Sequence, residues 1–222
     1  MKFYFNASPN PTKVALFLEE AGLPYEPIPV DHRKGDQFKP EFLALNPNGK
    51  VPVIDDDGVV VFDSNAILLY LAEKTGKFMP PASERPQMLS WMMFVATGIG
   101  PFTGQAVHFK HFAPERVEYA HKRYQFEATR HFTILDERLA KRPFVVGDAY
   151  SFVDMSAWGW ARMLPFVLGD DIWAKFPHIK KWHDLIAARP AAGRAVALKD
   201  KFTFKANVDD EARAIMFRHL AS

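Results

Sequence analysis

The spacing of apolar and polar residues along the first third of the chain predicts alternating strands and helices. Two short runs, Lys2–Asn6 and Tyr25–Val30, indicate strands, and the prolines of the second suit a sheet edge. Between them, a helical apolar spacing follows two prolines, which fit a first helical turn, and ends at Gly22. Asp57-Gly58 then joins two further apolar runs and is typical of a hairpin turn.

Two more helices complete this first part. Pro40–Leu43 indicates a short helix after a polar loop, and Asp63-Ser64 caps a helix that continues to about Lys74. The predicted order is β-α-β-α-β-β-α, with the hairpin supplying the last two strands. This order predicts a mixed four-stranded sheet with helices on its faces.

After residue 85 the pattern predicts helices and no strand. The helical stretches lie at about 86–111, 115–140, 152–168, 175–188 and 191–198. Pro101 is expected to break or kink the first of them, and Pro165 to end or bend another. Ser151 and Asp154 have the spacing of a capping box, with Asp in the usual place of Glu.

The chain is therefore expected to hold an α/β domain followed by an all-helical domain. The predicted bounds are 1–78 for the first domain, 79–85 for a linker, and 86–222 for the second domain with its C-terminal tail. Residues 1–80 are net acidic and the remainder is net basic, which supports a boundary near 80. The charge imbalance is too small to indicate nucleic-acid binding.

The composition limits the reactive groups and metal ligands that the protein itself can supply. The 222 residues include no Cys, which excludes disulfides, thiolate metal sites and a protein-borne thiol nucleophile. A reactive thiol would therefore have to arrive on a ligand. His108 and His111 lack ligand-spaced partners, so no metal site is expected. No apolar run suits a signal peptide or a membrane span, and a soluble cytoplasmic protein is expected.

Ser8-Pro9-Asn10, at the predicted start of the first helix, is the first of three local features that carry chemistry. A hydroxyl and an amide beside a positive helix end can favour a thiolate over a thiol. The alternative is a plain N-cap, since Ser and Asn are the preferred capping residues.

The other two features are Val51-Pro52 and Asp63-Ser64. A cis bond before Pro52 would turn the Val51 backbone outward to pair with a peptide-like ligand; the alternative is a trans Pro that opens a strand. Asp63 and Ser64 could receive the ammonium and carboxylate groups of an amino acid, and the alternative is again helix capping.

Taken together, these features give the chain a resemblance to the cytosolic glutathione transferase superfamily over nearly its whole length. The likeness extends to the Nu class of bacteria, which is related to the yeast prion-type nitrogen regulator. The stretches that carry it are 8–14, 35–43, 46–52, 66–76, 105–109 and 211–213. The resemblance implies a thioredoxin-like first domain, a helical second domain and a homodimer. Its members use glutathione as co-substrate and no metal.

The resemblance also assigns roles by position. Ser8 and Asn10 would stabilise the glutathione thiolate, and Val51, before cis-Pro52, would pair with the cysteinyl unit. The remaining contacts are Asp63 and Ser64 with the γ-glutamyl end, Gln37 and Lys50 with the glycyl carboxylate, and Arg130 from its own or the partner subunit.

The implied activity is disulfide reduction by glutathione, with conjugation of electrophiles as a further, detoxifying reaction. Where this chain has Ser8, the family pattern commonly has Thr. Ser also occurs in classes that activate the thiol for conjugation, so a conventional glutathione S-transferase is an alternative. A non-catalytic glutathione-binding regulator is a second alternative. The substrate is expected to be a small disulfide or a hydrophobic electrophile, with no nucleic acid or membrane as partner.

Overall fold

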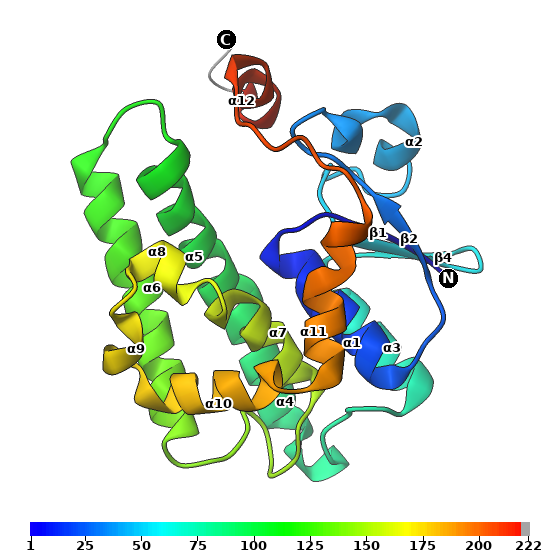
Figure 1. The fold of residues 1–222 in the computed structure, drawn as a ribbon. Helices are drawn as coiled ribbons and strands as arrows, with labels where there is room; N and C mark the ends of the chain where they lie inside the picture. Colours follow the sequence, from blue (N-terminus) through cyan, green and yellow to red (C-terminus); the bar gives the residue numbers. More distant parts are fainter. Residues whose placement is uncertain (219–222) are drawn as a thin grey trace. The chain divides into compact units, whose positions relative to one another are not determined.

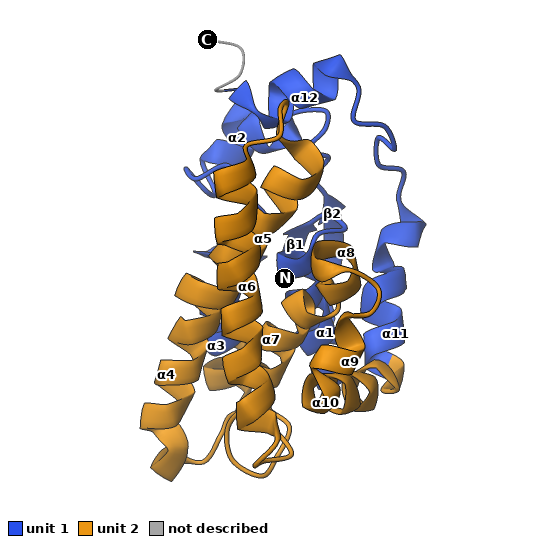
Figure 2. Ribbon diagram, turned by 90° about the vertical axis from the view of Figure 1, so that its left-hand side faces the viewer, with its two compact units in different colours: residues 1–70, 191–222 blue, residues 71–190 orange. Residues whose placement is uncertain are grey.

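A computed structural model describes residues 1–218, which form two compact units. Unit 1 comprises residues 1–70 together with the chain from 191 onward, and unit 2 comprises residues 71–190 (Figure 2). The predicted C-terminal domain extends to residue 222, and its last four residues lie outside the described residues. The units group residues by their mutual packing, and the predicted domain boundaries at 78 and 86 stay a prediction.

Unit 1 contains a mixed four-stranded sheet in the order β2-β1-β3-β4 (Figure 1). The strands are β1 (Lys2–Phe5), β2 (Glu26–Pro29), β3 (Val53–Asp56) and β4 (Val59–Phe62). Strand β1 runs parallel to β2 and antiparallel to β3, and β3 pairs with β4 as a hairpin. The proline-containing β2 lies at an edge, as its sequence indicates. Its two prolines lack N–H groups, and an edge strand has no second neighbour that would need them.

Helices cover both faces of this sheet. Helices α1 (Pro9–Ala21) and α3 (Ser64–Thr75) lie on one face, and α2 (Pro40–Leu43) lies on the other (Figure 1). Alternation along β1 explains the division, because neighbouring side chains point to opposite faces. Phe3 and Phe5 stack on each other and are buried, whereas Tyr4 packs edge-on against Phe42 of α2.

The C-terminal part of the chain packs with unit 1. Helix α11 (Pro190–Ala197) is tied to α1 by Arg194, whose Nε donates to Glu19 Oε2 at 2.6 Å. After it, Phe202 and Phe204 pack edge-on against Phe5 of β1. Helix α12 (Asp210–Met216) follows. Residues at opposite ends of the described chain therefore share one apolar core.

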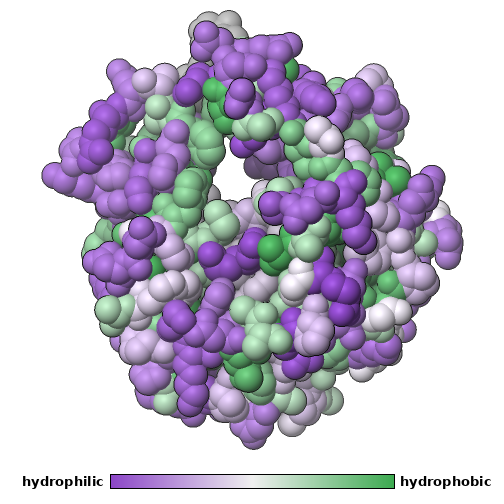
Figure 3. All heavy atoms as spheres, in the orientation of Figure 1, coloured by the Kyte–Doolittle hydropathy of each residue, from purple (hydrophilic) through white to green (hydrophobic). Residues whose placement is uncertain are grey.

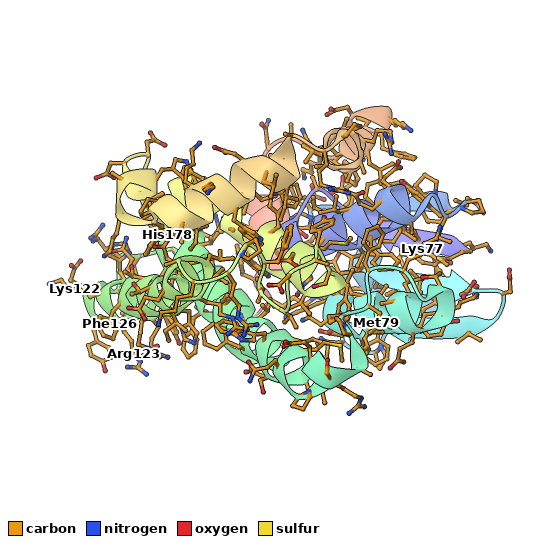
Figure 4. The ribbon with its side chains drawn as sticks, turned by 90° about the horizontal axis from the view of Figure 1, so that it is seen from below. Lys77, Met79, Lys122, Arg123, Phe126 and His178 are labelled. Carbon is orange, nitrogen blue, oxygen red and sulfur yellow. The ribbon has the colours of Figure 1, made fainter. Side chains whose placement is uncertain are left out.

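Unit 2 is helical. Its helices are α4 (Arg85–Phe94), α5 (Gly100–Val107), α6 (Glu118–Leu139), α7 (Phe152–Ala161), α8 (Leu164–Leu168), α9 (Ile172–Lys175) and α10 (Pro177–Ala187). Every residue of α7 is buried, which makes it the centre of this unit. On the longer α6, Ala128, Phe132 and Leu135 are buried, whereas Lys122, Arg123 and Phe126 are exposed on the outer side (Figure 4).

The predicted capping box is present at the start of α7. The Asp154 carboxylate accepts the backbone N–H of Ser151 at 3.0 Å, and its other oxygen accepts from Val145 N at 2.9 Å and Trp182 Nε1 at 3.0 Å. Asp154 is fully buried, which raises the pKa of its carboxyl to about 6 although these hydrogen bonds act in the opposite direction. The box therefore does more than cap one helix, because it ties α7 to a loop and to α10.

The first long helix of unit 2 is less regular than its pattern predicts. Pro101 lies in the first turn of α5, and the five residues before that helix, Val95–Ile99, form a π-helical segment. A second π-helical segment, His108–Phe112, follows α5. The expected disturbance at Pro101 is therefore a widened turn. In that turn Gly98 lies against α6, and a Cβ built there would be 2.5 Å from the His131 ring.

The surface has mixed character. Figure 3 shows hydrophilic residues over much of the visible face, with apolar residues scattered between them. None of the helices within residues 1–218 is both long enough and apolar enough to cross a bilayer.

Candidate functional site

The loop after β1 places Ser8 immediately before α1. Ser8 has an extended backbone, with φ −86° and ψ 166°, and its side chain makes no capping bond to the helix. Its hydroxyl instead donates to Asn6 Oδ1 at 2.6 Å, and its backbone N–H donates to the same atom at 3.0 Å. The capping alternative therefore does not describe the Ser8 hydroxyl, which is held by the preceding loop.

The start of α1 offers fewer backbone donors than a typical helix N-terminus. Pro9 and Pro11 have no N–H, and Thr12 N–H donates to Ser8 O at 3.2 Å. The Thr12 hydroxyl donates to the same carbonyl at 2.9 Å. An anion at this point would therefore depend more than usual on the helix dipole and on side chains, including that of Asn10 in the first turn.

The loop before β3 presents the Val51 backbone. The Val51–Pro52 peptide bond is cis, as the resemblance implies. Asn46, which is buried, braces this loop: its Nδ2 donates to Lys50 O at 2.6 Å, and its Oδ1 accepts from Asn48 N at 3.0 Å. The Lys50 side chain is exposed, whereas the Val51 side chain packs on the small apolar cluster beneath α2.

At the start of α3, Asp63 combines an unusual backbone with a capping role. Its φ of 68° lies in the left-handed region, which Asp tolerates better than most residues. Asp63 Oδ1 accepts from Asn65 N at 2.8 Å and from Ala66 N at 3.2 Å. Within residues 1–218, Oδ2 of the same carboxylate has no hydrogen bond. One oxygen thus caps the helix while the other can serve a ligand, and the buried Ser64 follows directly.

Lys13 adds a charge that sequence reasoning missed. It lies on α1 with only 1% of its surface exposed, and its Nζ donates to Asn65 Oδ1 of α3 at 3.1 Å. Burial lowers the Lys13 pKa to about 7, and the negative charge of Asp63 acts in the opposite direction. A lysine among the apolar residues of a predicted helix was the available signal. The contact couples α1, which begins beside Ser8, to the turn that holds Asp63.

The loop from Asp31 to Phe38 brings Gln37 toward the same region. Gln37 is buried and its Nε2 donates to His32 O at 3.2 Å. His32 Nδ1 in turn lies 3.2 Å from Asn6 Nδ2. On the other side, a Cβ built on Gly49 would lie 3.3 Å from Gln37 O, so the loop of Gln37 and the loop of Lys50 are neighbours.

These contacts connect the predicted site residues of unit 1. One path runs from Ser8 through Asn6, His32 and Gln37 to the loop of Lys50. A second path joins α1 to the Asp63 turn through Lys13 and Asn65. Asn6, Lys13, His32, Asn46 and Asn65 support the predicted residues, and the sequence analysis assigned a site role to none of the five.

Arg130 belongs to unit 2 and lies on α6. Its Nε donates to Glu127 Oε2 at 2.9 Å, and its Nη2 lies 3.3 Å from His131 Nε2. The Arg130 guanidinium therefore has an ion-pair partner on its own helix, and the role of Arg130 toward glutathione stays a prediction. Residues 1–218 contain no group of His, Asp and Glu side chains that could hold a metal ion.

Family models decide the assignment. The description "Glutathione S-transferase, N-terminal domain" matches residues 7–74, and "Glutathione S-transferase, C-terminal domain" matches residues 91–190. The chain belongs to the glutathione S-transferase family. The predicted fold, a thioredoxin-like domain with a mixed four-stranded sheet followed by a helical domain, is thereby confirmed.

Among its relatives, this glutathione S-transferase is 43% identical to the disulfide-bond oxidoreductase YfcG of Escherichia coli over 94% of the chain and 96% of that protein. It is 36% identical to the disulfide-bond oxidoreductase YghU of the same organism, over 87% of the chain and 73% of that protein. These relatives confirm the resemblance to the Nu class.

Solved structures of similar glutathione transferases contain glutathione. A Burkholderia graminis enzyme with two glutathione molecules per subunit is 38% identical, with a TM-score of 0.82 over 88% of this chain and 87% of that one. A Pseudomonas putida enzyme with one glutathione disulfide per subunit is 33% identical, with a TM-score of 0.82 over 88% and 90%. Ure2p in complex with glutathione is 30% identical, with a TM-score of 0.81 over 87% and 97%.

Proposed function

We propose that this glutathione S-transferase reduces disulfides with glutathione. The observation that carries the proposal is its 43% identity, over 94% of the chain, to a disulfide-bond oxidoreductase. The absence of Cys among the 222 residues fits a reaction in which glutathione supplies the sulfur. Related structures with two glutathione molecules, or with glutathione disulfide, fit a reaction that consumes two thiols.

In this proposal the first glutathione lies along the loops of unit 1. The Val51 backbone pairs with its cysteinyl unit. Asp63, through Oδ2, receives the ammonium group of the γ-glutamyl end, and Ser64 receives its carboxylate. Gln37 and Lys50 lie toward the glycyl carboxylate, where the exposed Lys50 ammonium provides the charge.

The sulfur would lie at the start of α1, near Ser8 and Asn10. A free thiol has a pKa of about 8.5–9, so only a few per cent is ionised at neutral pH. Lowering that pKa by ~2 units requires ~2.7 kcal/mol of preferential binding to the anion. One charge-assisted hydrogen bond together with the helix dipole is of that size. The Ser8 hydroxyl or the Asn10 amide would supply that hydrogen bond in this proposal.

The reaction then has two exchange steps. The glutathione thiolate attacks one sulfur of the substrate disulfide, forms a mixed disulfide and releases the other half of the substrate as a thiolate, which takes a proton from water. A second glutathione thiolate attacks the glutathione sulfur of the mixed disulfide. This step releases glutathione disulfide and the second substrate thiolate, so two thiols are oxidised and one disulfide is reduced.

Conjugation is the second candidate, because Ser8 supplies a hydroxyl at the position where some transferase classes activate the thiol. In that reaction the same thiolate attacks an electrophilic carbon and displaces its leaving group. The substrate class differs between the two candidates, while the glutathione contacts are shared. Homodimerisation and a role for Arg130 are further parts of the proposal.

Parallel assays test the proposal. The purified protein is given glutathione with a small model disulfide, and glutathione disulfide formation is followed through NADPH oxidation by glutathione reductase. A chloronitrobenzene electrophile replaces the disulfide in the second assay. We expect faster turnover of the disulfide. Conjugation alone would support the second candidate, and binding without either reaction would support a regulatory protein.

A further inference from the structure

Asn6 lies between Ser8 and His32 and contacts both with its side-chain amide. Asn6 Oδ1 accepts the Ser8 hydroxyl at 2.6 Å and the Ser8 backbone N–H at 3.0 Å, and Asn6 Nδ2 lies 3.2 Å from His32 Nδ1. Asn6 is 6% exposed, so water does not compete freely for these bonds. No role at the sulfur site attaches to Asn6 or to His32 in the proposed function above.

The donors and acceptors of this network follow from one bond. A backbone N–H can only donate, so the atom of Asn6 that faces Ser8 N must be the carbonyl oxygen Oδ1. The amide nitrogen Nδ2 then faces His32 and donates to it. His32 Nδ1 must therefore carry a lone pair, which makes this imidazole neutral with its proton on Nε2.

The charges around His32 agree with a neutral ring. Burial lowers the His32 pKa, and the neighbouring Arg33 guanidinium acts in the same direction, while Asp31 opposes both. Asp31 is itself occupied: it accepts from Arg33 N at 3.0 Å and from Lys205 N of the C-terminal segment at 2.6 Å, and it lies 3.8 Å from Lys34 Nζ.

The network directs the Ser8 proton. Because that proton is committed to Asn6 Oδ1, the Ser8 oxygen turns only lone pairs toward a ligand. A lone pair can accept a hydrogen bond from a thiol, but it repels a thiolate. We propose that Asn6 and His32 are positioning residues that keep the Ser8 hydroxyl from donating to the glutathione sulfur, and so leave stabilisation of the thiolate to Asn10. This assignment rests on the proposed function.

The first experiment measures histidine titration by NMR in the protein without glutathione, so it does not depend on the proposed function. In Asn6→Asp, one carboxylate oxygen still accepts from Ser8, and the other faces His32 Nδ1. The His32 pKa, assigned by loss of its signal in His32→Gln, should rise from below to above its ordinary value. The half-buried His183 should not shift. An unchanged His32 pKa in a folded Asn6→Asp protein would overturn the network.

A second experiment measures the pKa of bound glutathione from the ultraviolet absorbance of its thiolate. Without Asn6 the Ser8 hydroxyl can donate to the sulfur, so Asn6→Ala should lower this pKa by about one unit, a tenfold gain in thiolate stability. Adding Ser8→Ala should reverse that gain, whereas Ser8→Ala alone should have little effect. His183→Phe is the matched control.

The pattern of outcomes separates this inference from the proposed function. If Asn6→Ala leaves the pKa of the bound thiol unchanged, or if Ser8→Ala alone raises it by one unit or more, the inference is wrong while glutathione binding stands. If calorimetry detects no glutathione binding to the unmodified protein, the proposed function fails. In that case the titration of His32 still decides whether the network exists.

Discussion

Lys13 on α1 donates a hydrogen bond to the side-chain oxygen of Asn65 on α3, at 3.1 Å. The two residues are 52 positions apart, and both are buried beneath the turn that carries Asp63 and Ser64. An ammonium group in this position offsets the negative charge of Asp63, while its own burial opposes the charged form. The contact therefore links the energetics of the fold to the charge of the proposed glutathione site.

The first prediction concerns Lys13 and pH. Its pKa falls from 10.5 in the unfolded chain to about 7 in the folded protein. Between these values the unfolded state binds more protons, so the free energy of unfolding should rise with pH, by about 1 kcal/mol per unit from this group alone. Urea unfolding can be measured at about pH 7.0, which is near the folded pKa, and at about pH 8.5, which is above it. The rise in the free energy of unfolding between these two pH values should be smaller in Lys13→Met than in the unmodified protein. An equal rise in both proteins would contradict the prediction.

The second prediction separates the two ends of the proposed glutathione site. Asn10→Ala removes a donor to the thiolate, so disulfide turnover should fall roughly tenfold or more while glutathione affinity changes less. Steady-state kinetics and calorimetric titration measure the two effects.

Ser64→Ala is the matched variant at the γ-glutamyl end. It should lower affinity more than turnover at saturating glutathione, because Ser64 contacts a part of the molecule that does not react. Equal and negligible effects of Asn10→Ala and Ser64→Ala would discredit the site.

The third prediction concerns Asp154. Its carboxylate accepts from Val145 N, Ser151 N and Trp182 Nε1, all in buried positions. Asp154→Ala leaves these donors without a partner and should lower the free energy of unfolding by about 3 kcal/mol or more. Denaturant unfolding measures the loss. The exposed Asp148→Ala, in the preceding loop, should stay within about 0.5 kcal/mol of the unmodified protein.

The fourth prediction concerns the C-terminal segment. Arg33 Nη1 donates to Lys205 O and to Ala206 O, each at 2.7 Å, and so holds this segment on the loop that follows β2. Arg33→Ala should speed amide hydrogen exchange from residue 202 to residue 216, because the segment then opens more often. Arg116→Ala, which removes an exposed ion pair in unit 2, is the control. Unchanged exchange in Arg33→Ala would mean that the aromatic contacts with Phe5 suffice.

Local sequence signals predicted most of the fold. Gly22 ends α1 in a left-handed conformation with φ 63°, Asp57-Gly58 turns the hairpin, and the Ser151–Asp154 box starts α7. Each signal acts within a few residues, where backbone preference and capping chemistry leave little choice. Local signals predicted a disturbance at Pro101 but not the π-helical segment before it, because the form of that segment depends on packing against His131 of α6.

The candidate site was predictable only in part. Ser8, Asn10, Val51, Pro52, Asp63 and Ser64 occur in recognisable local motifs. The residues that support them do not: Asn6 meets His32 across 26 positions, and Lys13 meets Asn65 across 52. Such pairs depend on how β1, α1 and α3 pack, and no local pattern in the sequence records that.

Unit 1 consists of two stretches that are separated in the sequence by unit 2, and this order has a consequence for synthesis of the chain. Residues 71–190 emerge from the ribosome as one continuous block, so unit 2 has all of its residues while α11 and the segment around Phe202 have yet to be made. Until then, Phe5 lacks the rings of Phe202 and Phe204, and Glu19 lacks Arg194. Nascent chains arrested before residue 190 should therefore leave the sheet's aromatic face open to chaperones, and release of the finished chain should close it.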